Sequence, residues 1–484
     1  MGGDAMSRFS EYLEQAILRS GMKEKELAKA SGFARSYIAL MKNGQRVSPD
    51  TEKMTKLMMS LNLPPYEIEV FKEEYHRARV GDEAYERDEA VMEFFHSFWN
   101  TRKLEIKSRH EYEIPDVKTV DNRMDLERLI KAVIKNEAEK KDGYIHLVMQ
   151  GTGNMLKDIL PEVCESNKLL EVEHIVCMEQ YNEVGSKEDQ LYNVKMLKEL
   201  IPITVFSNSR KYKIYYYYDH VASKFNPGNL LSYMVLTSEY LICMDSNMTM
   251  GTISKDFEMR QLYEQLFQQH KKKCREMITY FRDETELQTY QTIKNGIEDV
   301  TYSISQQPCF GVLKIDGLIR KYMTRTNRQL LFNLEKMIQK NNQKIEREDN
   351  KHIAYCTKKG LQRFAKEGVV DELPKEIYTL LQKQDRKYML EQLVKLIDEG
   401  KYELYLIEEN GRNIPKELLI NVYGKSGMSV IYLSEDTESR FALNESSLTR
   451  TLYESLKNMS KSPKIYPAEE SRNYIKMLID ELKK

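Results

Sequence analysis

The stretch from Phe33 to Pro49 has the residue types expected of a segment that contacts DNA. It contains Arg35, Lys42 and Arg46 but no Asp or Glu. Phosphates flank both sides of the major groove, so a segment without acidic residues suits entry into that groove. Arg can pair with a guanine edge, and a small side chain can contact the thymine methyl group. We expect base-edge contacts from Arg35, Ser36, Tyr37 and Ala39, and phosphate contacts from Lys42, Asn43, Gln45 and Arg46.

Short helices are expected to position these side chains. Apolar residues recur at spacings of three and four from Phe9 to Ile17, which predicts a helix that stops at Gly21. The next helix stops at Gly32, whose type permits the left-handed backbone of a tight turn between helices. The apolar pattern then restarts at Phe33, and a further helix is expected from Pro49 to Leu61. Residues 1–67 therefore predict an all-α domain that contains a helix-turn-helix.

This segment resembles the Cro-repressor-type (XRE) helix-turn-helix family of transcriptional regulators. The resemblance implies a five-helix DNA-binding domain whose third helix, about Ala34 to Lys42, reads base edges. Glu24 stands where the family often has a Gln that contacts phosphate. Lys42 replaces the usual Glu, so we expect the family's ion pair at that position to be absent. The matching residues are Glu26-Leu27-Ala28, Gly32, Arg35-Ser36-Tyr37-Ile38, Asn43-Gly44-Gln45-Arg46, Pro49, Leu57 and Leu61.

The rest of the chain is expected to form a helical connector followed by an α/β region. Residues 68–140 keep a helical pattern and are expected to dimerise. Residues 141–282 alternate strand-like and helical runs, which predicts an α/β domain with a mainly parallel sheet. A second helical connector at 283–350 and a second α/β domain at 351–484 complete this multidomain fold. The dimer contact is expected at Phe71, Tyr75, Phe94 and Phe95; Ile203 to Phe206 is expected to be a strand, and Asp256 to Phe281 one long helix.

A weak internal repeat suggests that the α/β region consists of two related halves. Leu262-Tyr263-Glu264-Gln265-Leu266 matches Leu452-Tyr453-Glu454-Ser455-Leu456 at a shift of 190 residues. At the same shift, Tyr240 to Cys243 falls on Val430 to Leu433. Because this helix pattern is common among amphipathic helices, a chance match stays open as the alternative.

One turn in the α/β region is a candidate site for a small anionic ligand. Gly151-Thr152-Gly153-Asn154 follows an expected strand and precedes an expected helix, so its backbone amides could hold an anion. An ordinary strand-to-helix turn is the alternative. The paired halves also look faintly like the phospholipase-D-like fold that some transcription regulators use as a sensor. The catalytic H-x-K-x4-D signature of that fold is missing, since His270-Lys271-Lys272 is followed by Met277 at the position of the Asp. The resemblance therefore implies a binding module.

Composition and motif content exclude several other classes. The chain has 74 Lys and Arg against 75 Asp and Glu, so any surface for nucleic acid must be local. Its six cysteines are scattered without metal-ligand spacing, and no nucleophile or carboxylate motif is recognisable, so we expect no catalytic residues, metal or cofactor. No apolar run approaches the ~18 residues of a membrane span. We expect a cytoplasmic protein that does not act at a membrane and is not an enzyme.

The sequence as a whole predicts a transcription regulator that binds double-stranded DNA. A single helix-turn-helix reads few base pairs, so we expect a homodimer on a pseudo-palindromic operator. The α/β region would sense a ligand or hold the dimer together. Two alternatives stay open: a protein-interaction or defence-type module tethered to DNA, and an enzyme of unrecognised type in residues 141–484.

Overall fold

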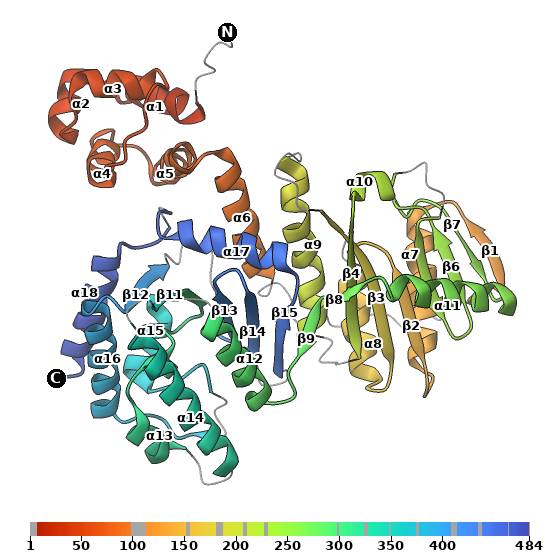
Figure 1. Ribbon diagram of the computed structural model, residues 1–484. Helices are drawn as coiled ribbons and strands as arrows, with labels where there is room; N and C mark the ends of the chain where they lie inside the picture. Colours follow the sequence, from red (N-terminus) through yellow and green to blue (C-terminus); the bar gives the residue numbers. More distant parts are fainter. Residues whose placement is uncertain are drawn as a thin grey trace. The chain divides into compact units, whose positions relative to one another are not determined.

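The computed structural model consists of two compact units, each built around its own core (Figure 1). The first comprises Met1–Glu89 with Ser455–Tyr466, and the second Ala90–Glu454 with Pro467–Lys484. The structure describes residues 7–97, 113–151, 155–180, 187–206, 211–226, 231–297, 300–323, 328–347, 350–373, 377–407, 414–433, 438–462 and 464–483.

The first unit contains a bundle of five helices. They are α1 (Arg8–Ser20), α2 (Glu24–Ser31), α3 (Arg35–Lys42), α4 (Thr51–Ser60) and α5 (Pro65–Val80). The residues after α1 and α2, Gly21 and Gly32, have φ of +65° and +76°, the left-handed conformation that glycine adopts without strain. One buried core joins all five helices through residues that include Phe9, Leu13, Leu27, Ile38, Leu57 and Phe71.

Helix α5 belongs to this bundle although it extends beyond residue 67. The rings of Phe9 and Phe71 meet edge to face with centroids 5.6 Å apart, and Phe9 also contacts Tyr75. The expectation that Phe71 and Tyr75 carry a dimer contact is wrong, because both are buried in the core of the bundle. Phe94 and Phe95, on α6 (Asp82–Ser97), are buried as well.

The second unit contains two mixed sheets, of which the first has the order β1-β7-β6-β5-β2-β3-β4-β8. Only β2, β3 and β4 run parallel, so the expected mainly parallel sheet is wrong. A strand also lies within the range expected to be a helical connector, since β1 pairs with β7. The strands are β1 (Val117–Val120), β2 (Tyr144–Val148), β3 (Glu171–Glu179), β4 (Tyr212–Asp219), β5 (Tyr233–Thr237), β6 (Leu241–Met244), β7 (Gly251–Ser254) and β8 (Arg275–Glu276).

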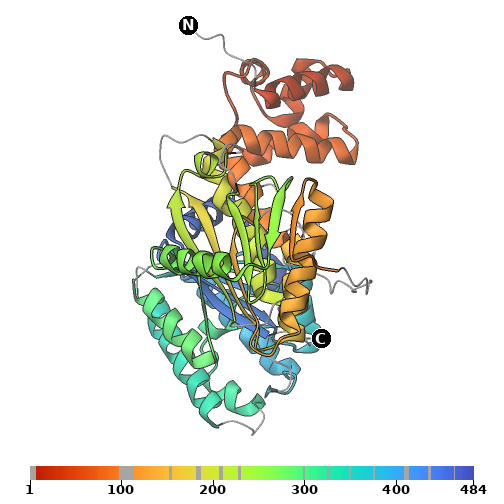
Figure 2. The same ribbon diagram turned by 90° about the vertical axis from the view of Figure 1, so that its right-hand side faces the viewer.

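Five helices accompany the first sheet (Figures 1 and 2). Phe267 of α11 packs with Ile175, Met234 and Leu236 on one face of the sheet. Two expectations fail here: residues 203–206 are the last turn of α9 and not a strand, and α11 ends at Lys271, after which β8 and β9 follow. The helices are α7 (Arg123–Ala138), α8 (Met155–Ser166), α9 (Lys187–Phe206), α10 (Val221–Lys224) and α11 (Phe257–Lys271).

The second sheet has the order β12-β11-β10-β13-β14-β15-β9, and its parallel strands are β10, β11 and β12. Strand β10 lies inside residues 283–350, so that range is not only a helical connector. The strands are β9 (Ile278–Tyr280), β10 (Val300–Ile304), β11 (Lys351–Thr357), β12 (Tyr402–Ile407), β13 (Leu418–Tyr423), β14 (Gly427–Leu433) and β15 (Glu438–Leu443). The helices are α12 (Glu284–Ile297), η1 (Phe310–Val312), α13 (Asp316–Tyr322), α14 (Arg328–Ile345), α15 (Lys358–Glu367), α16 (Lys383–Asp398), α17 (Ser446–Met459) and α18 (Ala468–Glu481).

The two sheets repeat one topology. β1 to β7 pair with one another as β9 to β15 do, with each partner in the corresponding place. The register agrees as well: Ile145 pairs with Val172 and Thr237, as Thr301 pairs with His352 and Tyr423. The ungapped shift of 190 residues nevertheless misplaces β6 by three residues, because pairing aligns Ile242 with Ser429 and not with Tyr432.

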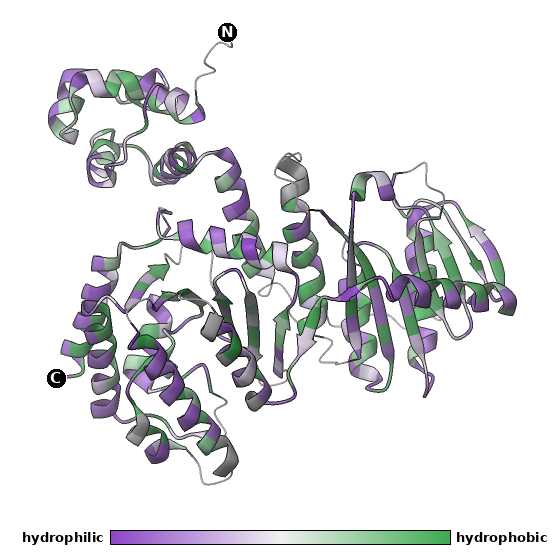
Figure 3. Ribbon diagram, viewed as in Figure 1, coloured by the Kyte–Doolittle hydropathy of each residue, from purple (hydrophilic) through white to green (hydrophobic). Residues whose placement is uncertain are grey.

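The faces of the two sheets correspond too. His146 of β2 stacks on Phe267 of α11, and its equivalent Tyr302 of β10 contacts Tyr453 of α17. Hydrophobic residues gather on the strands of both sheets (Figure 3). In the part of the chain that the structure describes, no helix has the length and apolar character needed to cross a membrane.

Candidate nucleic-acid interface

The turn between α2 and α3 presents the first residues of α3 on the surface. Helix α2 ends at Gly32, and the chain re-enters a helix after Ala34, which has an extended backbone. Ile38 and Met41 are fully buried and fix α3 against the bundle. The first turn of α3 contains no acidic residue. The N-terminus of α3, with the positive end of the helix dipole and the first backbone N–H groups, therefore carries no negative side chain of its own helix.

The four residues expected to read bases differ in their exposure. Arg35 has a side chain that is 70% exposed, and Ser36 is exposed beside it. Ala39 is half-buried. Tyr37 is half-buried too, because its ring stacks on Phe33 with centroids 5.5 Å apart and an interplanar angle of 4°. Arg35 and Ser36 are thus the most accessible of these side chains.

The turn that follows α3 supplies a second set of exposed polar groups. Asn43, Gln45 and Arg46 are all exposed, and Gly44 has a φ of +70°. The backbone N–H groups of Gln45 and Arg46 both donate to the carbonyl oxygen of Leu40, at 3.0 and 3.3 Å. The turn is therefore ordered by its own backbone, and its side chains remain available to a partner.

Lys42 is held inside the bundle by acidic residues, which the sequence reasoning missed. Its Nζ lies 3.2 Å from Glu24 and 3.7 Å from Glu14, and its side chain is only 21% exposed. Arg35 Nε donates to the same Glu24 at 3.3 Å. These hydrogen bonds, first from Lys42 and then from Arg35, hold the pKa of Glu24 below its usual range. The expected absence of an ion pair at Lys42 is wrong: a pair exists, with Lys42 as the cation.

The candidate ligand turn after β2 is only partly within the described residues. Gly151 N–H donates to Met196 Sδ at 3.2 Å, and a Cβ at Gly151 would lie 3.1 Å from the same sulfur. Gly151 therefore packs closely against α9. Thr152, Gly153 and Asn154 lie outside the described residues, so whether this turn holds an anion stays a prediction.

The nearest approach to a catalytic signature is at the end of α11. His270 packs on the ring of Tyr217 with centroids 4.6 Å apart, Lys271 forms an ion pair with Glu173, and Met277 is fully buried. Within the described ranges, no cluster of three or more His, Cys, Asp or Glu side chains has the arrangement needed to hold a metal ion.

Two of the solved structures that are similar to this chain are both distant neighbours. No protein-family profile and no curated protein sequence matches the chain. TrmBL2, an archaeal chromatin protein whose structure shows a novel mode of DNA binding, matches at 14% identity, covering 55% of this chain and 93% of TrmBL2, with a TM-score of 0.22. Phosphatidylserine synthase of Haemophilus influenzae Rd KW20 matches at 9% identity, covering 76% and 92% of the two chains, with a TM-score of 0.24. Neither TM-score supports an argument about function.

The second neighbour nevertheless corrects one expectation. Phosphatidylserine synthase is an enzyme, and so the exclusion of enzymes drawn from missing motifs does not stand. The likeness assigns no reaction to this chain.

Proposed function

We propose that this chain is a sequence-specific regulator of transcription that binds double-stranded DNA through α2 and α3, a helix-turn-helix of the Cro-repressor (XRE) type. The observation that carries the proposal is the exposed, acid-free start of α3. Arg35 and Ser36 project there from a helix that Ile38 and Met41 anchor in the core. A short helix fixed on one side and polar on the other suits insertion into the major groove.

Each predicted contact then has a distinct role. Arg35 pairs with a guanine edge, while Ser36, Tyr37 and Ala39 complete the base-reading surface. The exposed turn of Asn43, Gln45 and Arg46 contacts phosphates and sets the register of α3 on the duplex. Lys42 contacts phosphate only after it exchanges Glu24 and Glu14 for the DNA backbone, because its ammonium group is already paired.

A homodimer completes the proposal. One module of this size contacts too few base pairs for selective binding in a genome, whereas two copies on a pseudo-palindrome, about 34 Å or a multiple apart, double the contact. In this proposal the two α/β halves serve for oligomerisation and for binding a ligand that changes the spacing of the two reading helices. An anionic ligand at the Gly151–Asn154 turn is part of this proposal. A ligand that weakens DNA binding must itself bind less tightly to the DNA-bound protein.

The test is selection of bound duplexes from a random-sequence pool with the full chain. We expect enrichment of one motif with two inverted half-sites. Recovery of unenriched sequence would contradict sequence-specific binding, and a single half-site would contradict the dimer.

A further inference from the structure

One face of the second sheet is polar where the equivalent face of the first sheet is apolar. Shared register makes five positions equivalent between the two halves. Burying polar groups costs free energy, so this second face is not the ordinary core that the first half has. In the first half the positions hold Ile145, Leu147, Val172, Val235 and Ile242, each 0% exposed. In the second half they hold Thr301, Ser303, His352, Asn421 and Ser429, each 9% exposed or less.

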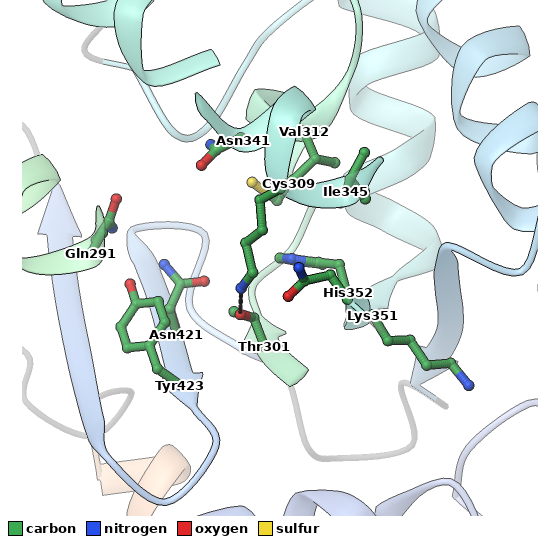
Figure 4. A pocket seen from close by; sticks show the side chains of 12 residues that line it. Gln291, Thr301, Cys309, Val312, Asn341, Ile345, Lys351, His352, Asn421 and Tyr423 are labelled. Atoms are coloured by element: carbon green, nitrogen blue, oxygen red, sulfur yellow. Dashed lines mark hydrogen bonds between the residues drawn. The ribbon is translucent and has the colours of Figure 1, made fainter. Parts of the chain in front are cut away.

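Three of these polar side chains, Thr301, His352 and Asn421, line a cavity of about 60 Å³ (Figure 4). Thr301 lies between Asn421 on β13 and His352 on β11. Lys344 of α14 donates to Thr301 Oγ1 at 3.0 Å, which places a positive charge at the wall of the cavity. One water needs roughly 10–15 Å³ of such volume, so the cavity has room for about four to six non-hydrogen atoms.

Several polar groups of the lining have no hydrogen-bond partner among the described residues. Asn421 is 8% exposed, and its carboxamide has no hydrogen-bond partner among the described residues. Asn350 Oδ1 is buried without a partner as well. His352 Nε2 lies 3.0 Å from Ser303 Oγ, while its Nδ1 has no partner in the described part of the chain. Burial lowers the pKa of His352 to about 3, so the ring is neutral near pH 7. Native structures satisfy nearly all buried polar atoms, so the unpartnered Asn350 Oδ1 points to a bound water or ligand.

We propose that this cavity binds a small carboxylate that carries a neighbouring hydroxyl or amino group, either free or at the end of a larger molecule. Lys344 supplies the positive charge for the carboxylate. The Asn421 amide and the His352 ring supply hydrogen-bond donors to its oxygens. Asn350 Oδ1 is an acceptor and requires a donor on the ligand, which the hydroxyl or amino group provides. Glycolate and glycine, with five non-hydrogen atoms each, match the volume. This site does not depend on DNA binding by the first unit.

The test is calorimetric titration of the full chain with four probes, namely glycolate, glycine, acetate and inorganic phosphate, each to about 10 mM because ligands this small bind weakly. We expect glycolate or glycine to bind at least about threefold more tightly than acetate or phosphate. No heat with any probe would overturn the proposal, since the cavity would then hold water only. Equal binding of acetate or phosphate would overturn the assigned chemistry.

Three variants make the test specific to the cavity. Asn421→Val installs the residue type found at the equivalent Val235, so the sheet is expected to fold while affinity falls at least about tenfold. Lys344→Met is expected to lose a similar factor. Lys340→Met, one turn earlier on α14 and exposed, is the matched control and should bind as the parent chain does. If Asn421→Val does not fold, the affinity measured for Lys344→Met decides whether the probe binds in this cavity. Parent-like binding by Lys344→Met would contradict the site.

Discussion

Glu24 is predicted to weaken DNA binding, because it engages two of the cations that the proposed interface uses. Its carboxylate lies 3.3 Å from Arg35 Nε and 3.2 Å from Lys42 Nζ. Arg35 must leave Glu24 to reach a base edge, and Glu24 itself brings a negative charge toward the phosphates. The variant Glu24→Gln keeps the shape and an amide oxygen but removes the charge.

The magnitude follows from the exposure of the pair. Two unit charges at about 3.3 Å in water attract by about 1.3 kcal/mol before salt screening. The Arg35 side chain is 70% exposed, and exposed pairs contribute about 0.2–1 kcal/mol in measured cases. Releasing this pair should therefore raise DNA affinity by about 0.5–1 kcal/mol, or roughly two- to fivefold. The salt dependence should steepen by up to about one released counterion, because Lys42 becomes available to phosphate.

The assay is fluorescence anisotropy on a selected duplex, at salt concentrations from about 50 to 200 mM, the range in which phosphate contacts are most visible. Glu52→Gln is the matched control, since it removes the same charge from an 80% exposed residue of the same bundle that pairs with Lys56. An affinity gain no larger than that of Glu52→Gln would show that Glu24 does not compete with DNA. A loss of affinity would show that Glu24 positions Arg35 instead, and would refute the reasoning.

Three further predictions concern specificity and stability. Arg35→Ala should lower affinity for the selected duplex by about 1–3 kcal/mol and relax preference at one base pair; equal loss on random DNA would make Arg35 a phosphate contact. Gly360→Ala should cost about 3 kcal/mol or more in urea unfolding, because a Cβ there would lie 1.8 Å from Gln306 O, whereas Gly317→Ala, with nothing within 4 Å, should cost nothing; equal effects of the two would refute the packing argument. His174 Nε2 donates to Met149 O and its Nδ1 accepts from Tyr212 Oη, and burial lowers the pKa of His174 to about 4. The unfolded chain binds that proton near pH 6.5, so the free energy of unfolding decreases as the pH is lowered from about 6.5 to 4, by up to about 1.4 kcal/mol per pH unit. His174→Gln should flatten this slope, and an unchanged slope would contradict the role of His174.

Local signals in the sequence were sufficient to predict the first helices and where they end. Apolar spacing from Phe9 to Ile17 and the stops at Gly21 and Gly32 reflect short-range geometry, and α1 and α2 end at these glycines. The presence of an α/β region followed from alternating runs in the same way. Pairing direction did not, because it depends on which distant strands meet.

Two errors have identifiable physical causes. Ile203 and Val205 are β-branched and follow Pro202, which favours a strand, but burial of both side chains keeps them in the last turn of α9. Strand β10 escaped notice because Thr301 and Ser303 interrupt its apolar pattern. Thr301 also lines the cavity, so one of the two residues that concealed the strand belongs to the proposed ligand site.

The ionic contacts of the candidate interface were beyond the reach of spacing arguments. Glu24 and Lys42 are 18 residues apart and meet only because α2 and α3 pack around the turn at Gly32. The residue types at the start of α3 were sufficient to single out Arg35 and Ser36. The competing partner of Arg35 required the fold.

Photocrosslinking of the full chain to the selected duplex, followed by peptide mapping, tests the central claim most directly. The account predicts crosslinks in the peptides that contain Arg35 to Ala39 and Asn43 to Arg46. These crosslinks should persist when an unrelated duplex competes and should be lost when the unlabelled selected duplex competes. Crosslinks confined to the α/β region, with none in α3 or the turn that follows it, would contradict the proposed mode of DNA binding.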